Sequence, residues 1–438
     1  MKKKIILSLV ALIMSGAAMV KTYAQNEAPG KPQSKPIALT GATIHQGNGE
    51  VITNGTLVFD KGIITAIGGS EIAFDRNATE VVDLAGKHIF PGTIAMSSTL
   101  GIQEIASVRA TLDFAEVGDV NPHVRSLIAY NTDSEVIPTV RSSGVLMAQA
   151  TPQGGLFSGT SSVFNLDGWN WEDAVLKKDD GIWLNWPSYL VRSYNRTDFT
   201  VTVKQNEGRQ RVVDLIKSTL VEAKAYHEIS STSPVNLRLA SLKGLFDGSQ
   251  NLYIRANYAK DIIESVKLMK DLGVKKIVIC EAEESYKVAS FLADEKIPVV
   301  LNKIHRLPSR PDDDVFLPYK IPGILHQAGV LVAISYGNDY WGLRNLNYQA
   351  GTASGFGAID PEEALQFVAL NPAKILGIDQ NVGSLEKGKL ATLIVTSGDA
   401  LDMRSNIVER AFIKGADVNL DDKQRKLYSK YKEKYGQE

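Results

Sequence analysis

The chain has 438 residues, with 48 Lys and Arg against 49 Asp and Glu, so its formal net charge is −1. This balance, with no basic stretch beyond the extreme N-terminus, argues against nucleic acid as a partner. Hydrophobic residues make up 44% of the chain and charged residues 22%, which excludes a disordered or fibrous protein. The single Cys280 can neither close an intramolecular disulfide nor supply a cysteine-based zinc motif, so any metal site would draw on carboxylates and the six His.

Residues 1–24 have the pattern of a secretion signal. Three lysines open the chain, residues 5–20 are mostly apolar, and small residues precede a cleavage point between Ala24 and Gln25. The alternative is an uncleaved membrane anchor, but the apolar run is interrupted and shorter than the about 20 residues that a span requires. The sequence therefore predicts a periplasmic or secreted protein without a membrane span after cleavage. Residues 25–36, rich in Pro, are predicted to form a linker.

The remaining chain divides into a β-rich beginning, a long middle and a β-rich end. Residues 37–90 contain short β-type runs broken by Gly and Asn, and β character returns in residues 379–420. We expect these two parts to form one small, discontinuous β-sandwich. Residues 421–438 form a charged tail, read as a solvated terminal helix or a frayed end.

Residues 91–378 alternate between apolar runs of strand length and amphipathic stretches of helix length. Four strand and helix pairs in succession begin at residue 252, and buried parallel strands have such unbroken apolar runs. The pattern predicts an α/β fold, a (β/α)8 TIM-like barrel with parallel strands. Residues 154–162, rich in Gly, Ser and Thr, are interpreted as a turn-rich loop that lines the barrel mouth.

Motifs at both ends of the predicted barrel carry a resemblance to a known family. Residues 86–94 read GKHIFPGTI, residues 371–378 read NPAKILGI and residues 383–389 read GSLEKGK. In combination they resemble the amidohydrolase superfamily, and residues 344–353 and 361–365 are similar to its imidazolonepropionase-like branch. Three further segments look like exported bacterial amidohydrolase-like proteins: residues 121–124, 131–135 and 154–162. The resemblance, over about residues 37–420, implies hydrolysis of carbon–nitrogen bonds by water activated on one or two divalent cations at the barrel mouth.

The family's metal ligands have poor counterparts in this chain. Its first strand typically carries a His-x-His pair, and the corresponding positions here are Ser97 and Thr99. A later strand tends to carry a second His-x-His pair, and there the chain has Arg255 and Asn257. Hydroxyl groups are poor zinc ligands, and an arginine is a fixed cation that repels a metal. The resemblance therefore implies a site that has lost its metal.

Three further residues are candidates for the mouth. Asp339 lies near the position of the family's catalytic Asp, although an ordinary loop Asp is the alternative. Glu281 ends one predicted strand and His305 follows another, so both are candidate pocket residues. A metal site built from these three residues is geometrically possible, but no local motif supports it.

Two functions follow as hypotheses. The first is an exported amidohydrolase-like protein that is non-catalytic, needs no cofactor, and binds a small amide or peptide or pairs with an active homologue. The second is an active hydrolase of amide or dipeptide bonds with an atypical site, a divalent metal such as zinc, and Asp339 as proton shuttle. Either could form a homo-oligomer, and the sequence specifies no substrate.

Overall fold

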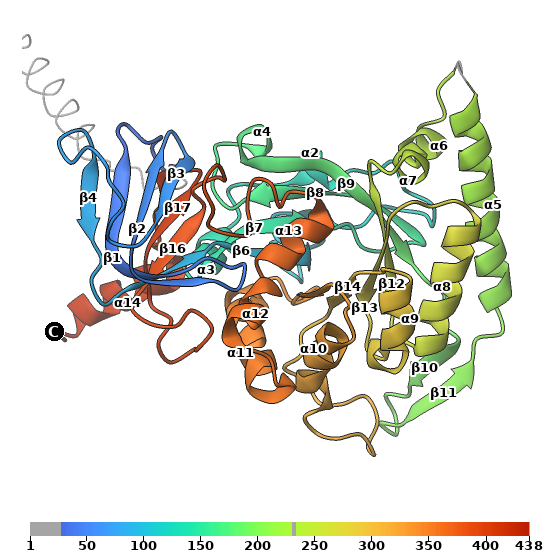
Figure 1. Cartoon of the computed structure of the whole chain (residues 1–438). Helices are drawn as coiled ribbons and strands as arrows, with labels where there is room; N and C mark the ends of the chain where they lie inside the picture. The colour runs from blue at the N-terminus through green and yellow to red at the C-terminus, as the bar shows by residue number, and fades with distance from the viewer. Residues whose placement is uncertain (1–27, 230–233, 438) are drawn as a thin grey trace, which may run out of the picture.

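The structure is a computed structural model that describes residues 28–229 and 234–437. The predicted secretion signal of residues 1–24 lies outside the described residues. Within the described part of the chain, no helix has the length and apolar character needed to cross a membrane. Figure 1 shows a sheet domain on one side of the molecule and a barrel surrounded by helices on the other.

The sheet domain joins the beginning of the described chain to its end. In Figure 1 the blue N-terminal strands and the red C-terminal strands lie side by side. The joint is the antiparallel pair of β5 and β16, in which Phe90 faces Ile394 across the ladder. One eight-stranded sheet results, formed by β1 (Ile37–His45), β2 (Val51–Asp60), β3 (Ile63–Gly68), β4 (Glu80–Asp83), β5 (His88–Pro91), β16 (Leu393–Thr396), β17 (Val408–Ile413) and β18 (Ala416–Asp417).

This sheet curls back on itself instead of splitting into two separate sheets. The backbone N–H of Ile64 donates to the carbonyl of Lys389 at 2.8 Å, and Ala391 donates to Gly62 at 2.8 Å, which brings the β3 edge to the segment before β16. Fully buried Leu39, Phe59 and Phe412 belong to the core that the curled sheet encloses. The predicted sandwich is therefore one continuous sheet around a single core.

The second eight-stranded sheet forms the predicted barrel, and the TIM-like fold is confirmed. Neighbouring strands are parallel except at β8, which runs antiparallel to both β7 and β9. In barrel order the strands are β6 (Thr93–Ser98), β7 (Val145–Ala150), β8 (Phe157–Asn165), β9 (Val175–Asn185), β12 (Asn251–Ala256), β13 (Ile277–Glu281), β14 (Val299–Leu301) and β15 (Val332–Ile334).

Strand β8 corrects the interpretation of residues 154–162 as a mouth loop. Residues 157–162 are buried and form the first part of this strand. Small hydroxyl side chains can fill a buried strand when they find partners, and Ser161 donates to the carboxylate of Asp180 at 2.7 Å. Composition alone indicated a loop because it does not show such long-range partners.

The barrel is closed at the seam between β6 and β15 by residues of another segment. The N–H of Ile334 donates to the carbonyl of Phe367 at 3.0 Å, and the N–H of Ile94 donates to that of Val368 at 2.8 Å. Near the mouth, the Ser335 hydroxyl donates to the Met96 carbonyl at 2.8 Å and bridges the seam directly.

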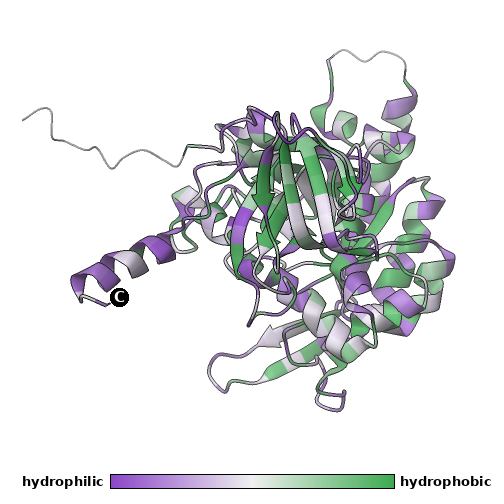
Figure 2. Ribbon diagram, turned by 60° about the vertical axis from the view of Figure 1, so that its left-hand side comes forward, coloured by the Kyte–Doolittle hydropathy of each residue, from purple (hydrophilic) through white to green (hydrophobic). Residues whose placement is uncertain are grey.

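Helices cover the outside of the barrel, and one seals its floor. Leu376 of α13 (Leu370–Leu376) packs with the inward side chains of the strands at their N-terminal ends. The terminal α14 (Lys423–Lys434) buries no side chain and projects from the body as a mostly hydrophilic helix (Figures 1 and 2). The larger outer helices are α5 (Arg209–Glu228), α8 (Ala259–Asp271), α9 (Ala289–Asp294), α10 (Leu317–Gln327), α11 (Leu346–Gly357) and α12 (Pro361–Gln366).

Smaller elements complete the described chain. The hairpin of β10 (Leu190–Tyr194) and β11 (Val201–Gln205) is antiparallel and exposed. The short helices are α2 (Ser126–Ala129), α3 (Ile137–Arg141), α4 (Trp171–Ala174), α6 (Leu237–Ser241) and α7 (Lys243–Asp247), and the single-turn 3₁₀ segments are Arg109–Thr111, Ser285–Val288 and Gly342–Asn345.

Candidate functional site at the barrel mouth

Polar residues meet where the barrel strands reach their C-terminal ends. Ser97 lies near the end of β6, Glu281 ends β13, and Asn302 and Ser335 follow β14 and β15. With Asn338 they line a cavity of about 30 Å³. This volume holds about one water molecule. A larger molecule could therefore place only one of its groups inside the cavity and would have to rest over the mouth.

The backbone around this cavity is strained. Ser97, Glu281 and Ala282 have φ angles of 53°, 69° and 52°, in the left-handed region that residues with a Cβ seldom adopt. Such conformations cost about 1–3 kcal/mol each and gather at functional sites. The strain at the ends of β6 and β13 marks the mouth as the place where a function would be found.

Arg255 of β12 fills the barrel interior beneath the mouth. Its guanidinium donates to the carbonyl of Pro152 at 2.9 Å, to Oδ1 of Asn185 at 2.9 Å and to Oγ of Ser158 at 3.3 Å. All three acceptors are neutral, and the nearest carboxylate is that of Glu281, 4.0 Å from Nε. Burial lowers the pKa of Arg255, and the charge of Glu281 opposes this effect.

Two aromatic rings lie in sequence below Arg255 in the barrel interior. The guanidinium carbon lies 4.4 Å from the centre of the Trp183 ring, and the Trp183 and Tyr253 rings stack with centres 4.6 Å apart. Both rings are fully buried. A cation on an aromatic face in a desolvated place is a stabilising contact. Side chains thus occupy the space along the barrel axis.

Glu281 connects Arg255 to the cavity. Its Oε2 accepts a hydrogen bond of 2.8 Å from Nδ2 of Asn257, and its exposed fraction of 34% leaves the carboxylate accessible from the mouth. Asn257 itself accepts the backbone N–H of Glu283 at 3.3 Å, which holds its amide in place. The structure therefore brings Ser97, Glu281, Arg255 and Asn257 into one connected region.

Thr99, His305 and Asp339 do not line the small cavity. Thr99 is buried and donates to Oε1 of Gln103 at 2.8 Å. His305 lies 2.7 Å from the Thr352 hydroxyl of α11, and burial lowers its pKa. Asp339 is 45% exposed, lies 3.5 Å from Nζ of Lys303, and caps a turn by accepting the N–H of Gly342. It belongs to the loop that follows β15.

Sequence reasoning missed a buried carboxylate deeper in the barrel. Asp180 is fully buried and accepts hydrogen bonds from Tyr253 at 2.7 Å, Ser161 at 2.7 Å and Gln149 at 2.9 Å. Burial raises the pKa of Asp180, while the hydrogen bonds and the charge of Lys177 act in the opposite direction. Gln149 also accepts the backbone N–H of Ser97 at 3.0 Å, so this network supports the strained end of β6.

The donors at the mouth do not fit a divalent metal. Within residues 28–229 and 234–437 no three His, Cys, Asp or Glu side chains form a group that could hold one. Glu281 is the carboxylate of the cavity, its other polar neighbours are hydroxyls and amides, and the Arg255 cation lies 4.0 Å away. A zinc site requires imidazole, thiolate or carboxylate ligands in a defined geometry.

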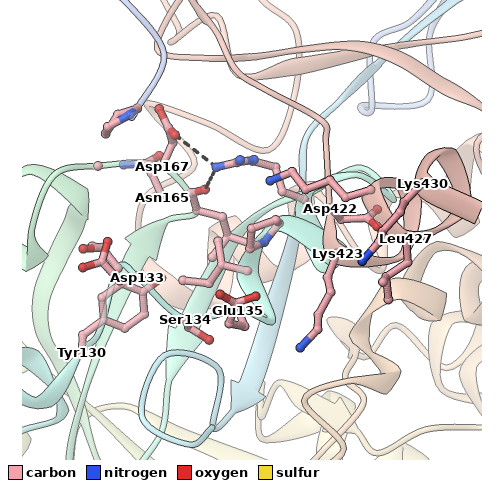
Figure 3. Close-up of a pocket in the computed structure, with 18 residues that line it drawn as sticks. Tyr130, Asp133, Ser134, Glu135, Asn165, Asp167, Asp422, Lys423, Leu427 and Lys430 are labelled. Carbon is pink, nitrogen blue, oxygen red and sulfur yellow. Dashed lines mark hydrogen bonds and ion pairs between the residues drawn. The ribbon is translucent and has the colours of Figure 1, made fainter. Parts of the chain in front are cut away.

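A much larger hollow than the mouth cavity lies elsewhere. A groove of about 780 Å³ runs between α3 and α14, outside the barrel. Figure 3 shows Asp133 and Glu135 on the side of the barrel loop and Lys423 and Lys430 on the side of α14. This groove mixes both signs of charge and shares no lining residue with the mouth cavity.

Comparisons with known proteins agree with this architecture. The sequence model of the Amidohydrolase family matches residues 319–419. An imidazolonepropionase from Flavobacterium psychrophilum is 31% identical over 109 residues, which are 23% of this chain and 26% of that protein. The match therefore spans about a quarter of that curated relative.

Solved structures extend the likeness over most of the chain. The crystal structure of an amidohydrolase from Thermotoga maritima superimposes with a TM-score of 0.74 and 26% identity, and covers 87% of this chain and 99% of that one. An adenosine deaminase from Xanthomonas campestris with bound zinc gives 0.52 and 13% identity, covering 92% and 98%, and shows the fold alone. The chain belongs to the amidohydrolase superfamily. The similarity to an imidazolonepropionase extends over those 109 residues.

Proposed function

We propose that this protein is a non-catalytic member of its superfamily that binds a small amide or peptide group at the barrel mouth. The observation that carries the proposal is the placement of Arg255. Its guanidinium, held by three neutral acceptors and stacked on Trp183, lies at the position where the resemblance aligns a metal-binding His. A fixed cation there opposes the binding of a metal cation, so water would not be activated in the family's way.

The chemistry of the mouth supports an amide ligand. An amide group has one good donor and one good acceptor. Glu281 offers an acceptor at the cavity, while Asn302 and Asn338 carry side-chain amides that can donate. Because the cavity has room for about one water molecule, a ligand would insert a single polar group and lay the rest over the mouth. The left-handed φ angles of Ser97 and Glu281 persist only because the surrounding structure holds these residues in place.

Three measurements on the purified protein test this proposal. We expect metal content far below one equivalent after dialysis, no turnover across a panel of cyclic amides and dipeptides, and a rise in melting temperature with one or more of these compounds. The Glu281→Gln variant should lose that rise, because the amide nitrogen that replaces one oxygen cannot accept a hydrogen bond. The matched control is Glu207→Gln, because Glu207 is an exposed acid that follows β11 and does not line the mouth cavity.

An active hydrolase is the competing function, and kinship with the imidazolonepropionase of Flavobacterium psychrophilum favours it. It requires Asp339 to move protons although it faces solvent beside Lys303. Stoichiometric zinc that survives dialysis, together with amide turnover that Asp339→Asn abolishes, would establish this alternative and refute the non-catalytic proposal.

Export and partnership are further parts of the proposal. The pattern of residues 1–24 supports cleavage before Gln25, which N-terminal sequencing of the protein from a periplasmic fraction would test. A non-catalytic protein of this fold can act as the partner of an active homologue. Co-purification of such a homologue at a fixed ratio would support a hetero-oligomer, whereas a single species of one chain would leave ligand binding as the role.

A further inference from the structure

A second hollow lies at the floor of the barrel, at the opposite ends of the strands from the mouth. It is lined by Asn251 and Ile277, which begin β12 and β13, by Leu331 just before β15, and by the end of α13. Its volume is about 350 Å³. This size lies within the range of about 300–1,000 Å³ that small-molecule sites occupy.

The charges around this hollow are almost all positive. Glu295 is the acid that lines it, and this carboxylate forms an ion pair with Lys270. The protein as a whole has a net charge of −1, so the positive charge is local to the floor. Six lysines line the hollow: Lys177, Lys270, Lys275, Lys276, Lys296 and Lys374.

Half of these lysines have a structural explanation. Lys270 and Lys374 lie in the last turns of α8 and α13, where a cation complements the carbonyl end of a helix. Lys177 is half-buried and donates to the carbonyl of Leu376 at 2.6 Å, so it ties β9 to the end of α13. Burial lowers the pKa of Lys177, the carboxylate of Asp180 raises it, and the neighbouring charge of Lys276 lowers it again.

The other three lysines have no such partner. The ammonium groups of Lys275, Lys276 and Lys296 form no hydrogen bond or ion pair with any residue of the described chain. They lie outside the helices, in the turns that follow α8 and α9. Like charges held around one hollow repel each other, and an anion between them would remove that repulsion.

We propose that this floor hollow, defined by Lys275, Lys276 and Lys296, binds a small soluble anion that carries phosphate groups. Three ammonium groups without partners, with Lys177 at the inner wall, can offset more than one negative charge, which a phosphate ester or pyrophosphate supplies. Lysine is a compact point charge that suits phosphate oxygens without a fixed geometry. The recessed shape favours a small molecule over a flat, extended surface.

Titration calorimetry with sodium pyrophosphate at low ionic strength tests this site. We expect saturable binding by the wild-type protein that weakens as salt is added, since salt screens exposed charges. The variant Lys275→Gln/Lys276→Gln/Lys296→Gln should raise the dissociation constant by at least about tenfold. The control Lys423→Gln/Lys426→Gln/Lys430→Gln removes the same charge from the α14 groove and should bind as the wild type does.

Other outcomes would overturn the proposal. Absence of saturable binding by the wild type, or equal loss in the α14 control, would show that net charge and not a site governs any affinity. Sedimentation with phosphatidylglycerol vesicles that the floor variant loses, without pyrophosphate binding, would assign the lysines to a lipid surface instead. The floor hollow shares no lining residue with the mouth cavity, so Glu281→Gln should leave pyrophosphate binding unchanged.

Discussion

The cationic side chains at the mouth and at the floor of the barrel differ in whether they have partners. At the mouth a single cation, Arg255, is buried and surrounded by acceptors, so the space is filled and the charge is satisfied. At the floor a hollow of about 350 Å³ is surrounded by lysines, three of which have no partner in the described chain. In this superfamily the mouth is where chemistry is expected. In this chain the mouth retains a cavity of only about 30 Å³ above packed side chains, whereas the hollow at the floor is about 350 Å³.

The difference teaches how bulky side chains fill the barrel interior beneath the mouth. Trp183 and Tyr253 stack beneath Arg255 and are fully buried, so the barrel axis is stabilised by the residues that fill it. A barrel interior is a packed core in any case, and bulky side chains on alternate strands normally occupy it. Substitutions of the buried side chains beneath the mouth should therefore change stability, whereas substitutions of the floor lysines should change anion binding.

The largest expected effect is that of Arg255→Met. Methionine keeps much of the volume but leaves the acceptors Pro152 and Asn185 without their donor and Glu281 without its nearest cation. Leaving a buried acceptor unsatisfied costs about 1–3 kcal/mol, and here several lose their donor together. Chemical denaturation followed by tryptophan fluorescence would measure the loss.

The control for this variant is Arg404→Met, because Arg404 is 86% exposed. Within the described residues its one ion pair is with the nearby Asp402. Arg404→Met should change stability by less than about 0.5 kcal/mol. Arg255→Lys should fall between the two, since an ammonium cannot reach all three acceptors. If Arg255→Met were as stable as the control, the view of the mouth as packed interior would be wrong.

The next largest loss of stability is expected for Asp180→Asn, a substitution inside the barrel between the mouth and the floor. Tyr253, Ser161 and Gln149 all donate to this carboxylate, and an amide would turn its own N–H groups toward at least one of these donors. An unsatisfied buried donor costs about 1–3 kcal/mol. The measurement is the free energy of unfolding at neutral pH.

Its matched control is the neighbouring Asp179→Asn. Asp179 is 32% exposed and pairs with Arg125 at 2.6 Å, an ion pair worth about 0–1 kcal/mol at such a surface. Burial raises the pKa of Asp180. Equal stability of Asp180→Asn and the wild type would therefore indicate that Asp180 carries a proton in the folded chain and can itself donate.

Asp180 also shows what the sequence could and could not predict. One β domain shared by both ends of the chain, and a barrel between them, followed from strand-length apolar runs and the motifs around Pro91 and Pro372, whereas the curling of a single sheet did not. Asp180 follows Lys177, Lys178 and Asp179, a charged run typical of a surface. Its burial depends on Tyr253, 73 residues further along the chain, and no local pattern shows that contact.

The floor site escaped prediction for a related reason. Its lysines come from the start of β9, the turns after α8 and α9, and the end of α13, so they are scattered from residue 177 to residue 374. Each alone is typical of a solvated surface lysine. By contrast, the resemblance to the family's metal motifs predicted Ser97 and Arg255 as mouth residues, and Glu281 was a candidate because it ends a predicted strand.

A smaller effect is expected on acidification. Burial lowers the pKa of His305 and, together with the charge of His45, that of His88. A depressed folded pKa means that the neutral histidine is favoured in the fold, so the stability is present above the ordinary value of about 6.5 and is lost as pH falls through the folded pKa.

Unfolding measurements from neutral to mildly acidic pH would show this decline in the wild type. The variant His88→Gln/His305→Gln lacks both of these imidazoles and should give a flatter profile. His227→Gln, which removes a histidine of α5, serves as the control for the loss of a histidine side chain. A double variant with the full wild-type slope would assign the pH dependence to other groups.

The smallest effect on stability is expected for the floor variant Lys275→Gln/Lys276→Gln/Lys296→Gln. These ammonium groups have no partner to lose in the described chain, and their mutual repulsion disappears with the charge. We expect the free energy of unfolding to change by less than about 0.5 kcal/mol at moderate salt. At low salt the variant should gain stability relative to the wild type, because repulsion between exposed charges is then least screened. A loss comparable to that of Arg255→Met would mean that the floor lysines, like the mouth arginine, belong to the packed structure, and the contrast between the two ends of the barrel would fail.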